Sequence, residues 1–515
     1  MDCLKSLPFH PAVATRFIDY YNTTIQFQST LAYLRDPPQG YQQPPVDVIQ
    51  TLNQIQRNIT TGVYRNQYAF EADLQLLIHQ IHDTHVNLYA GALSAFSFAS
   101  PQGLVSASVD GKQSPKIYLV DDVISCQNEP DHGRCIPEPV VQINGVDAIE
   151  YLTNFAELNA FGYLEPHADF NSLMDSPVRD IQGDLSAFQS LTFYPGDALD
   201  FTYEDNSTYS TYWLGIYRGG SNTGPLTTPG DFYNYFVLGL LPASYKPDVE
   251  WWPTLPPDTT GGGTEDPLSD YGCRNDTPNW CKTTFGGFPD DPVTTQADLS
   301  VTGAGIVTGY ILDDLSTGVL SIPTFLQFDA DVGTFSDTVS TFFGDAMFHN
   351  VTRIIIDLQQ NSGGSVLLAF EIFKQIFSSI EPYAGSRMRS HELADVLGST
   401  YTNWWNSLEL HPDGPDGSGA NGVNYEIHAA DEWVITDRIN VVTGQNFTSW
   451  QEHYGPVTVH GDTFSLTQRY NLSSQVFDEA AFDGWDLTGD DSQLQAGAGT
   501  LRWMPEDMVI VGLQK

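Results

Sequence analysis

The most constraining stretch of the sequence is RIIIDLQQNSGGSVLLAFEIF, which runs from Arg353 to Phe373. RIIIDL is a continuous apolar run, typical of a strand in a sheet that is covered on both faces. The apolar run after Ser365 predicts a helix. Gly363 and Gly364 lie between the two, where they permit positive φ angles and a close backbone approach. The stretch therefore predicts a strand, a tight turn and a helix, the repeating unit of an α/β fold.

Ser365 stands at the predicted start of this helix and allows two interpretations. It is either an ordinary N-cap, the commonest role of serine at such a position, or a nucleophile near the positive end of the helix dipole. In the second case the amides near Gly363 and Gly364 would form an oxyanion hole. A phosphate-binding loop is disfavoured, because the stretch contains neither a Walker lysine nor a GxGxxG motif.

Chain length and net charge indicate a multidomain protein and disfavour nucleic-acid-binding and membrane-anchored classes. A chain of 515 residues is long enough for several domains. Its 64 acidic and 21 basic residues give a formal charge of -43, which disfavours binding to nucleic acids and to anionic membranes. The sequence contains no apolar run of the roughly 18 residues that cross a bilayer. We therefore expect neither a nucleic-acid partner nor a membrane anchor.

Cysteines and glycosylation sequons favour a secretory route. Two close cysteine pairs, Cys126 with Cys135 and Cys273 with Cys281, predict local disulfides and leave Cys3 over. Seven N-x-S/T sequons begin at Asn22, Asn58, Asn206, Asn275, Asn350, Asn446 and Asn471. The first residues, MDCLKSLPFHPAVATRF, have no apolar core of a signal peptide, so we expect that a leader is missing from the chain.

Residue composition and the spacing of apolar residues divide the sequence into four segments. Helical spacing of apolar residues dominates the first of them, 1–115, whereas 116–250 contains short strand-like runs and PVVQINGVDAIEYL, which predicts a strand, an Asn-Gly turn and a helix. Residues 251–300 are rich in proline and glycine and predict a linker. The predicted α/β unit occupies 301–515.

Four motifs resemble one enzyme family. DLQQNSGGS resembles the D-L-x-x-N-x-G-G signature of tail-specific (C-terminal processing) serine peptidases. Its serine directly after the second glycine is similar to the branch named for the chlamydial protease-like activity factor, CPAF. IHDTHVNL at 81–88 is similar to the H-D-x-H segment of fungal CPAF-like proteins. PVVQINGVDAIEYL resembles the start of their PDZ-like module, and FTSWQEHYGP at 447–456 resembles a further stretch.

The resemblance implies a catalytic site. Ser365 would be the nucleophile and His85 the general base, with Gly363 and Gly364 as the oxyanion hole. A glutamate further along the chain would orient the histidine, for which we choose Glu426, with Asp431 and Glu432 as alternatives. The reaction would be peptide-bond hydrolysis by an endopeptidase through an acyl-enzyme, without a cofactor. The partner would be a peptide or protein substrate, and the oligomeric state stays open.

The implied fold is multidomain α/β. It would comprise a helical N-terminal region (1–115), a PDZ-like β module (116–250), a linker (251–300) and a crotonase-like peptidase core (301–515). Fungal relatives continue past the strand matching PEDMVIVGLQK, so we expect the core to be incomplete at its C-terminus.

Two other functions compete with catalysis. His79, His82 and His85 recur at intervals of three, which would suit one helical face that binds zinc, although the chain has no HExxH motif. The protein is alternatively a secreted binding protein, whose PDZ-like module captures peptides by β-strand addition while the peptidase core is inactive.

Overall fold

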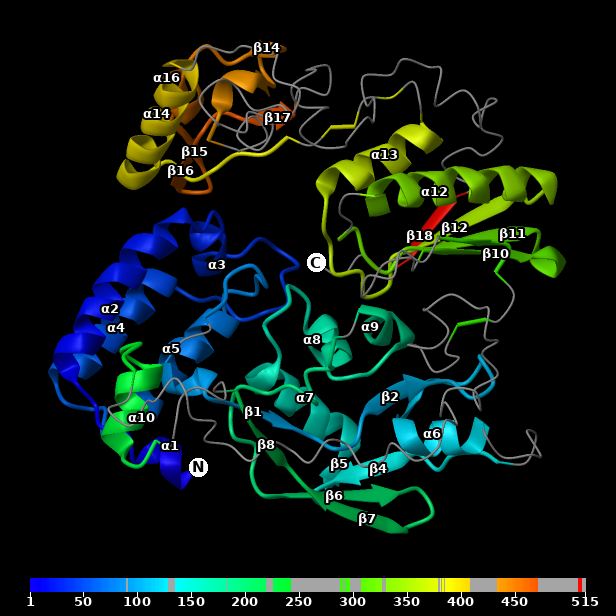
Figure 1. Cartoon of the computed structure of the whole chain (residues 1–515), viewed down its shortest axis with the longest axis horizontal. Coiled ribbons are helices and arrows are strands. Elements are labelled where there is room, and N and C mark those ends of the chain that lie inside the picture. The colour runs from blue at the N-terminus through cyan, green and yellow to red at the C-terminus, as the bar shows by residue number, and fades with distance from the viewer. Residues whose placement is uncertain are drawn as a thin grey trace.

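The structure is a computed structural model of the chain. It describes residues 1–88, 91–127, 135–182, 184–218, 226–241, 288–289, 292–296, 307–326, 330–377, 380, 382–383, 385–407, 433–470 and 508–511. These residues form four units, which we call the helical unit, the strand-rich unit, the α/β unit and the C-terminal unit (Figure 1).

The helical unit packs three helices of 13 or 14 residues, α2, α4 and α5, against shorter ones. Its elements are α1 (Asp2–Lys5), α2 (Pro11–Thr24), η1 (Ile25–Phe27), α3 (Leu31–Arg35), α4 (Val48–Thr60) and α5 (Gln67–His79). The side chain of Asp47 accepts the Gln50 amide at the start of α4, and Asn66 caps α5 through the Ala69 amide. Apolar residues at helical spacing are buried in both helices, which agrees with the predicted helices: Val48, Leu52, Ile55 and Ile59 in α4, and Phe70, Leu74, Leu77 and Ile78 in α5.

The strand-rich unit contains short antiparallel strands. Its elements are η2 (Gly91–Ser94), β1 (Phe96–Ala99), β2 (Leu104–Ala107), β3 (Lys116–Leu119), α6 (Val120–Gln127), β4 (Val140–Ile143), β5 (Val146–Asp147), α7 (Ala148–Asn159), α8 (Pro166–Ser172), α9 (Pro177–Gln182), β6 (Ala198–Tyr203), β7 (Thr208–Tyr212), β8 (Leu214–Tyr217) and α10 (Pro229–Phe236). Four strands form a sheet in the order β5-β4-β6-β7. The turn before β5 places Asn144 and Gly145 at φ angles of 49° and 77°, so the predicted strand, Asn-Gly turn and helix are confirmed.

The α/β unit contains the stretch RIIIDLQQNSGGSVLLAFEIF, residues 353–373. Its elements are β9 (Thr294–Thr295), β10 (Thr308–Leu312), η5 (Asp313–Leu315), β11 (Thr317–Ser321), α12 (Ala330–Phe348), β12 (Arg353–Asp357), α13 (Val366–Ile376) and β18 (Met508–Val511). The sheet order is β18-β12-β11-β10-β9, and β12 pairs in parallel with both β11 and β18. The predicted strand, turn and helix are therefore present as β12, the loop and α13.

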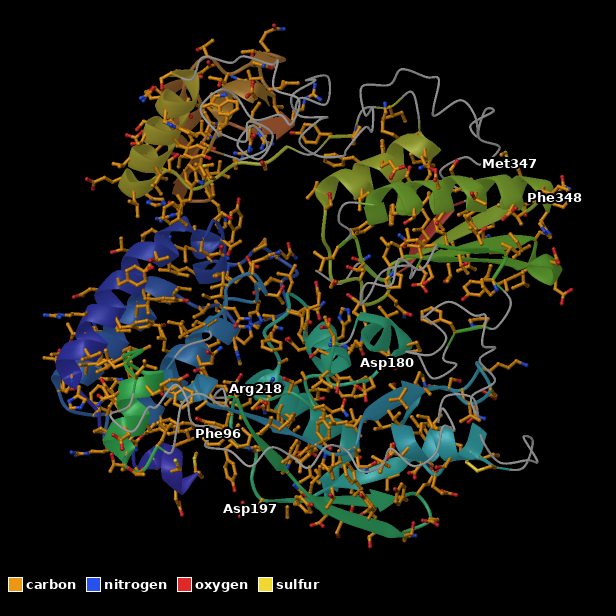
Figure 2. All side chains as sticks on the ribbon, viewed as in Figure 1. Phe96, Asp180, Asp197, Arg218, Met347 and Phe348 are labelled. Atoms are coloured by element: carbon orange, nitrogen blue, oxygen red, sulfur yellow. A yellow bond between two sulfur atoms is a disulfide. The ribbon has the colours of Figure 1, made fainter. Side chains whose placement is uncertain are left out.

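The two long helices of this unit lie on the same face of the sheet (Figure 1). Ile354 and Ile356 of β12 are buried in the core that contains α12 and α13, whereas Ile355 points to the opposite face and is half-buried. Figure 2 places Met347 and Phe348 at the outer end of α12. The predicted strand is therefore confirmed, helices α12 and α13 cover one face of its sheet, and cover on the other face stays a prediction.

The C-terminal unit is separate from the α/β sheet and lies beside the helical unit (Figure 1). Its elements are α14 (Glu392–Ser407), η6 (Ile435–Asp437), β13 (Arg438–Asn440), β14 (Gln445–Asn446), α16 (Trp450–Tyr454), β15 (Val457–Val459), β16 (Asp462–Phe464) and β17 (Gln468–Tyr470). Trp450 is buried against Gly398, where a Cβ atom would lie 2.1 Å from the indole ring. The segment predicted as one core thus folds into two units.

Candidate active site

A dense set of hydrogen bonds holds the turn after β12. The Asp357 carboxylate accepts the Gln359 amide at 3.0 Å, and Gln360 adopts a positive φ of 52°. The Asn361 side chain donates to the Ile322 carbonyl at 2.7 Å and accepts the Gly363 amide at 2.8 Å. Asn361, a signature residue of the motif, therefore joins the turn to the end of the neighbouring strand.

The paired glycines are required by the geometry of this turn. Gly363 and Gly364 have φ angles of 89° and 130°. The Phe325 amide donates to the Gly363 carbonyl at 2.7 Å, and the Ser365 amide donates to the Phe325 carbonyl at 2.9 Å. A Cβ atom on Gly364 would lie 2.1 Å from the carbonyl carbon of Phe325. A side chain at this position is therefore excluded by both the backbone angle and the close approach.

Ser365 occupies the N-cap position of α13 but does not cap it. Its backbone is extended, with φ −67° and ψ 117°, and its side chain makes no capping hydrogen bond. The residue is half-buried, and its hydroxyl has no hydrogen-bond partner among the described residues. The hydroxyl is therefore available at the positive end of the α13 dipole.

His85 lies in the loop that follows α5. Its side chain is 85% exposed, and its Nδ1 atom is 2.8 Å from Oδ1 of Asp83. The same Asp83 oxygen accepts the His85 amide at 3.0 Å, and its second oxygen accepts the Gln28 side-chain amide at 3.0 Å. Burial alone would raise the pKa of Asp83, but hydrogen bonds from Gln28 and His85 hold that pKa below its ordinary value.

One pocket joins the two predicted catalytic regions. It has a volume of about 360 Å³ and is lined by Thr84, His85, Tyr163, Arg179, Gln182, Asp184, Gln360, Asn361, Ser362, Gly363, Gly364 and Val366. Ser365 is not in this lining, but both of its neighbours are. His85 and Ser365 form no hydrogen bond with each other. The fold thus brings the His85 loop and the Ser365 turn to the same cavity, although 280 residues separate them in sequence.

Helix α9 of the strand-rich unit forms a third wall of the pocket. Ser362 donates to the Gln182 side chain at 2.5 Å, and Ser176 donates to the Gln360 side chain. Figure 2 shows Asp180 on the same helix, between the strand-rich unit and the α/β unit. Burial, reinforced by the charge of Asp175, raises the pKa of Asp180 to about 6. Sequence reasoning missed α9, because its residues match no motif.

Not all of the predicted site residues are described. Glu426, Asp431 and Glu432 lie outside the described residues, so the choice of orienting acid stays a prediction. The Gly363 amide is engaged by Asn361 in this structure. The Gly364 amide takes no part in the bridge to Phe325, whose two bonds use the flanking residues. The oxyanion roles of both glycines likewise stay predictions.

The three histidines do not share a helical face. Helix α5 ends at His79, and His82 follows it with a positive φ of 53°. The His79 ring is buried beside Gln75 and the Leu158 carbonyl, whereas His85 is exposed. Burial lowers the pKa of His79 to about 4. Within the described part of the chain, no cluster of potential metal ligands was found.

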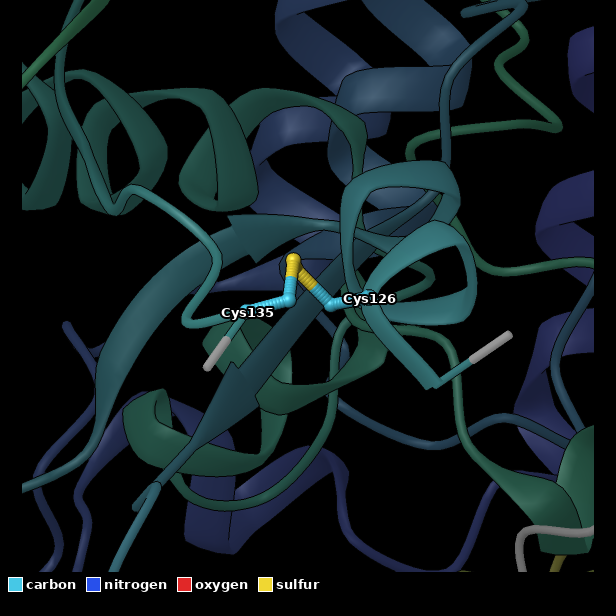
Figure 3. The surroundings of a disulfide bond; sticks show 2 residues. All are labelled: Cys126 and Cys135. Atoms are coloured by element: carbon cyan, nitrogen blue, oxygen red, sulfur yellow. A yellow bond between two sulfur atoms is a disulfide. The ribbon is translucent and has the colours of Figure 1, made fainter. Parts of the chain in front are cut away.

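The structure describes some, but not all, of the cysteines and sequons named in the predictions. Cys126 and Cys135 form a disulfide with a Cα–Cα distance of 5.1 Å (Figure 3), and Cys3 is an exposed free cysteine. Cys273, Cys281, Asn275 and Asn471 lie outside the described residues. The sequon asparagines that the structure describes are exposed at Asn206, Asn350 and Asn446 and half-buried at Asn22 and Asn58. Among the described helices, none combines the length and apolarity needed to cross a bilayer.

Comparisons with known proteins show which families this chain resembles. Residues 97–222 match the family model of the CPAF-like PDZ domain, which starts earlier and ends earlier than the predicted module at 116–250. Two proteins of the fungus Diaporthe leptostromiformis, the peptidase S41 family proteins phomP1' and phomP1, are each 27% identical over 447 residues, or 84% of this chain. The chain spans 59% of the length of each of these relatives.

One solved structure that is similar to this chain is the crystal structure of mature CPAF. It is 15% identical in sequence, with a TM-score of 0.42 over 80% of this chain and 67% of that one. By these sequence matches, the chain resembles the CPAF-like group of the peptidase S41 family.

Proposed function

We propose that the protein is a serine endopeptidase in which Ser365 is the nucleophile and His85 the general base. The observation that carries this proposal is the shared pocket. Its lining contains His85 from one unit and Gly363, Gly364 and Val366, which flank Ser365, from another. The uncapped hydroxyl of Ser365 supports the same assignment, because a purely structural serine at an N-cap normally accepts a backbone amide.

The proposed reaction is acyl transfer. The Nε2 atom of His85 takes the Ser365 hydroxyl proton as the oxygen attacks the scissile carbonyl, and the protonated ring then donates that proton to the leaving amine. Water hydrolyses the acyl-enzyme in the second half of the reaction. The α13 N-terminus and the Gly364 amide would stabilise the oxyanion. His85 and Ser365 must approach each other for this step, as is common for catalytic pairs without substrate.

Two further parts of the proposal concern fold and location. We infer a crotonase-like core from the family and from the parallel pairing of β11, β12 and β18. We also propose a secretory location. The Cys126–Cys135 disulfide and the exposed sequons at Asn206, Asn350 and Asn446 support it.

A binding function remains the second candidate because the strand-rich sheet has an exposed edge. In the described sheet order β7 is an outer strand, and most of its residues are exposed. Such an edge suits β-strand addition by a peptide. Peptide binding at this edge without any covalent labelling of Ser365 would favour this candidate.

Single and double variants test the enzyme proposal. We expect a fluorophosphonate probe to label Ser365, and we expect Ser365→Ala and His85→Ala each to lower peptide hydrolysis by at least about 10³-fold. The double variant should be about as slow as either single variant, because the two residues act as one unit. Independent, multiplicative losses in the two single variants would contradict a shared mechanism.

A further inference from the structure

The H-D-x-H segment contains its own acid–histidine pair. Asp83 Oδ1 lies 2.8 Å from the His85 Nδ1 atom and also accepts the His85 amide at 3.0 Å. The aspartate therefore fixes both the backbone and the ring of the same residue. In serine peptidases a carboxylate that accepts a hydrogen bond from Nδ1–H keeps the proton on Nδ1, so that Nε2 is free to act as the base.

Asp83 is itself held from a distant part of the chain. Its Oδ2 atom accepts the side-chain amide of Gln28 at 3.0 Å, and Gln28 also donates to the Thr30 hydroxyl at 2.9 Å. The Asp83 side chain is 30% exposed, against 85% for His85. A partly buried carboxylate with three hydrogen bonds is better fixed than the exposed ring it contacts, so Asp83 can position His85 rather than follow it.

We propose that Asp83 is the positioning acid of the catalytic histidine, an inference that rests on the proposed function. Asp83 accepts a hydrogen bond from the Nδ1–H group of His85 throughout the reaction and stays ionised. His85 Nε2 gains the Ser365 proton, so the transient imidazolium lies beside a carboxylate. On this proposal Asp83, and not Glu426, orients the catalytic histidine.

Other charged and titratable groups line the pocket and also influence how the labelling rate depends on pH. Arg179 and Asp184 line it together with His85, as does the titratable Tyr163. Asp83 is the carboxylate hydrogen-bonded to the His85 ring. A charge change at Asp83 should therefore have a larger effect on His85 than the same change elsewhere on the pocket wall.

The test compares three variants in the full chain. We expect Asp83→Asn to slow fluorophosphonate labelling of Ser365 by about 100-fold and Asp83→Glu to restore much of the rate. Asp205→Asn is the matched control, because Asp205 accepts the amide two residues ahead at 2.7 Å, as Asp83 does, but contacts no histidine.

A pH profile separates positioning from a merely structural role. Loss of the carboxylate beside the ring disfavours the protonated imidazole, so the acid limb of the labelling rate in Asp83→Asn should move to lower pH. A full rate in Asp83→Asn, or a slowed rate with an acid limb that does not move, would overturn the proposal. Failure of the wild type to label at Ser365 would instead overturn the proposed function.

Discussion

Gly364 shows how one residue shapes the candidate site. Its φ of 130° is a conformation that L-residues rarely adopt, and Phe325 leaves no room for a Cβ atom. The close approach allows the two hydrogen bonds between Phe325 and the turn. These bonds fix the direction in which α13 begins, and so the position of Ser365.

We expect Gly364→Ala to abolish labelling of Ser365 and to destabilise the protein by roughly 1–3 kcal/mol, because the methyl group must displace the Phe325 backbone. Chemical denaturation and the labelling rate measure the two effects. The control is Gly344→Ala in α12, where no atom lies within 4 Å of the added methyl group. That change should stabilise the helix by about 0.5–1 kcal/mol. Normal labelling by Gly364→Ala would refute the steric account of the turn.

At the scale of elements, α13 combines an available serine at its start with a buried acid in its middle. Glu371 is 1% exposed and accepts hydrogen bonds from Ser336 of α12 and from Gln375. Burial raises the pKa of Glu371 to about 8, although these hydrogen bonds act in the opposite direction. The carboxyl is therefore protonated at neutral pH and joins α12 to α13 as a neutral group.

This buried acid predicts a pH-dependent stability. A folded-state pKa above the unfolded value means that the stabilisation is complete below about pH 4.5 and is lost as the pH rises through about 8. Glu371→Gln should remove this loss, so the variant should exceed the wild type in stability at pH 8 by a few kcal/mol at most. Urea unfolding at several pH values measures it. The surface variant Glu157→Gln is the control, and equal pH slopes in Glu371→Gln and wild type would contradict the account.

The sequence predicted those elements whose signals are local. Periodic apolar residues marked α4 and α5, and the glycines marked the turn between β12 and α13, because each pattern reflects burial or backbone freedom within a few residues. The interpretation that His79, His82 and His85 share one helical face was wrong. The helix ends at His79, and the spacing of residues alone does not locate the end of a helix.

At the scale of the whole molecule, long-range contacts decide how the units meet. Arg389 of the C-terminal unit pairs with Asp462 at 2.6 Å and donates to the Gln26 side chain at 2.7 Å. Gln28, two residues further on, holds Asp83. The segment of the helical unit that holds the His85 loop thus also contacts the C-terminal unit, and no local pattern could have predicted these contacts or the docking of α9 on the Ser362 turn.

The most direct test of the account is a crystal structure of the protein after reaction with a fluorophosphonate. We expect the phosphonyl group on Ser365 Oγ, within the pocket, with Nε2 of His85 about 3 Å from that oxygen or from the phosphonyl group. We also expect Nδ1 of His85 to remain hydrogen-bonded to Asp83. An adduct on another residue, or a His85 ring directed away from a labelled Ser365, would contradict the claim that this pocket unites the two residues in catalysis.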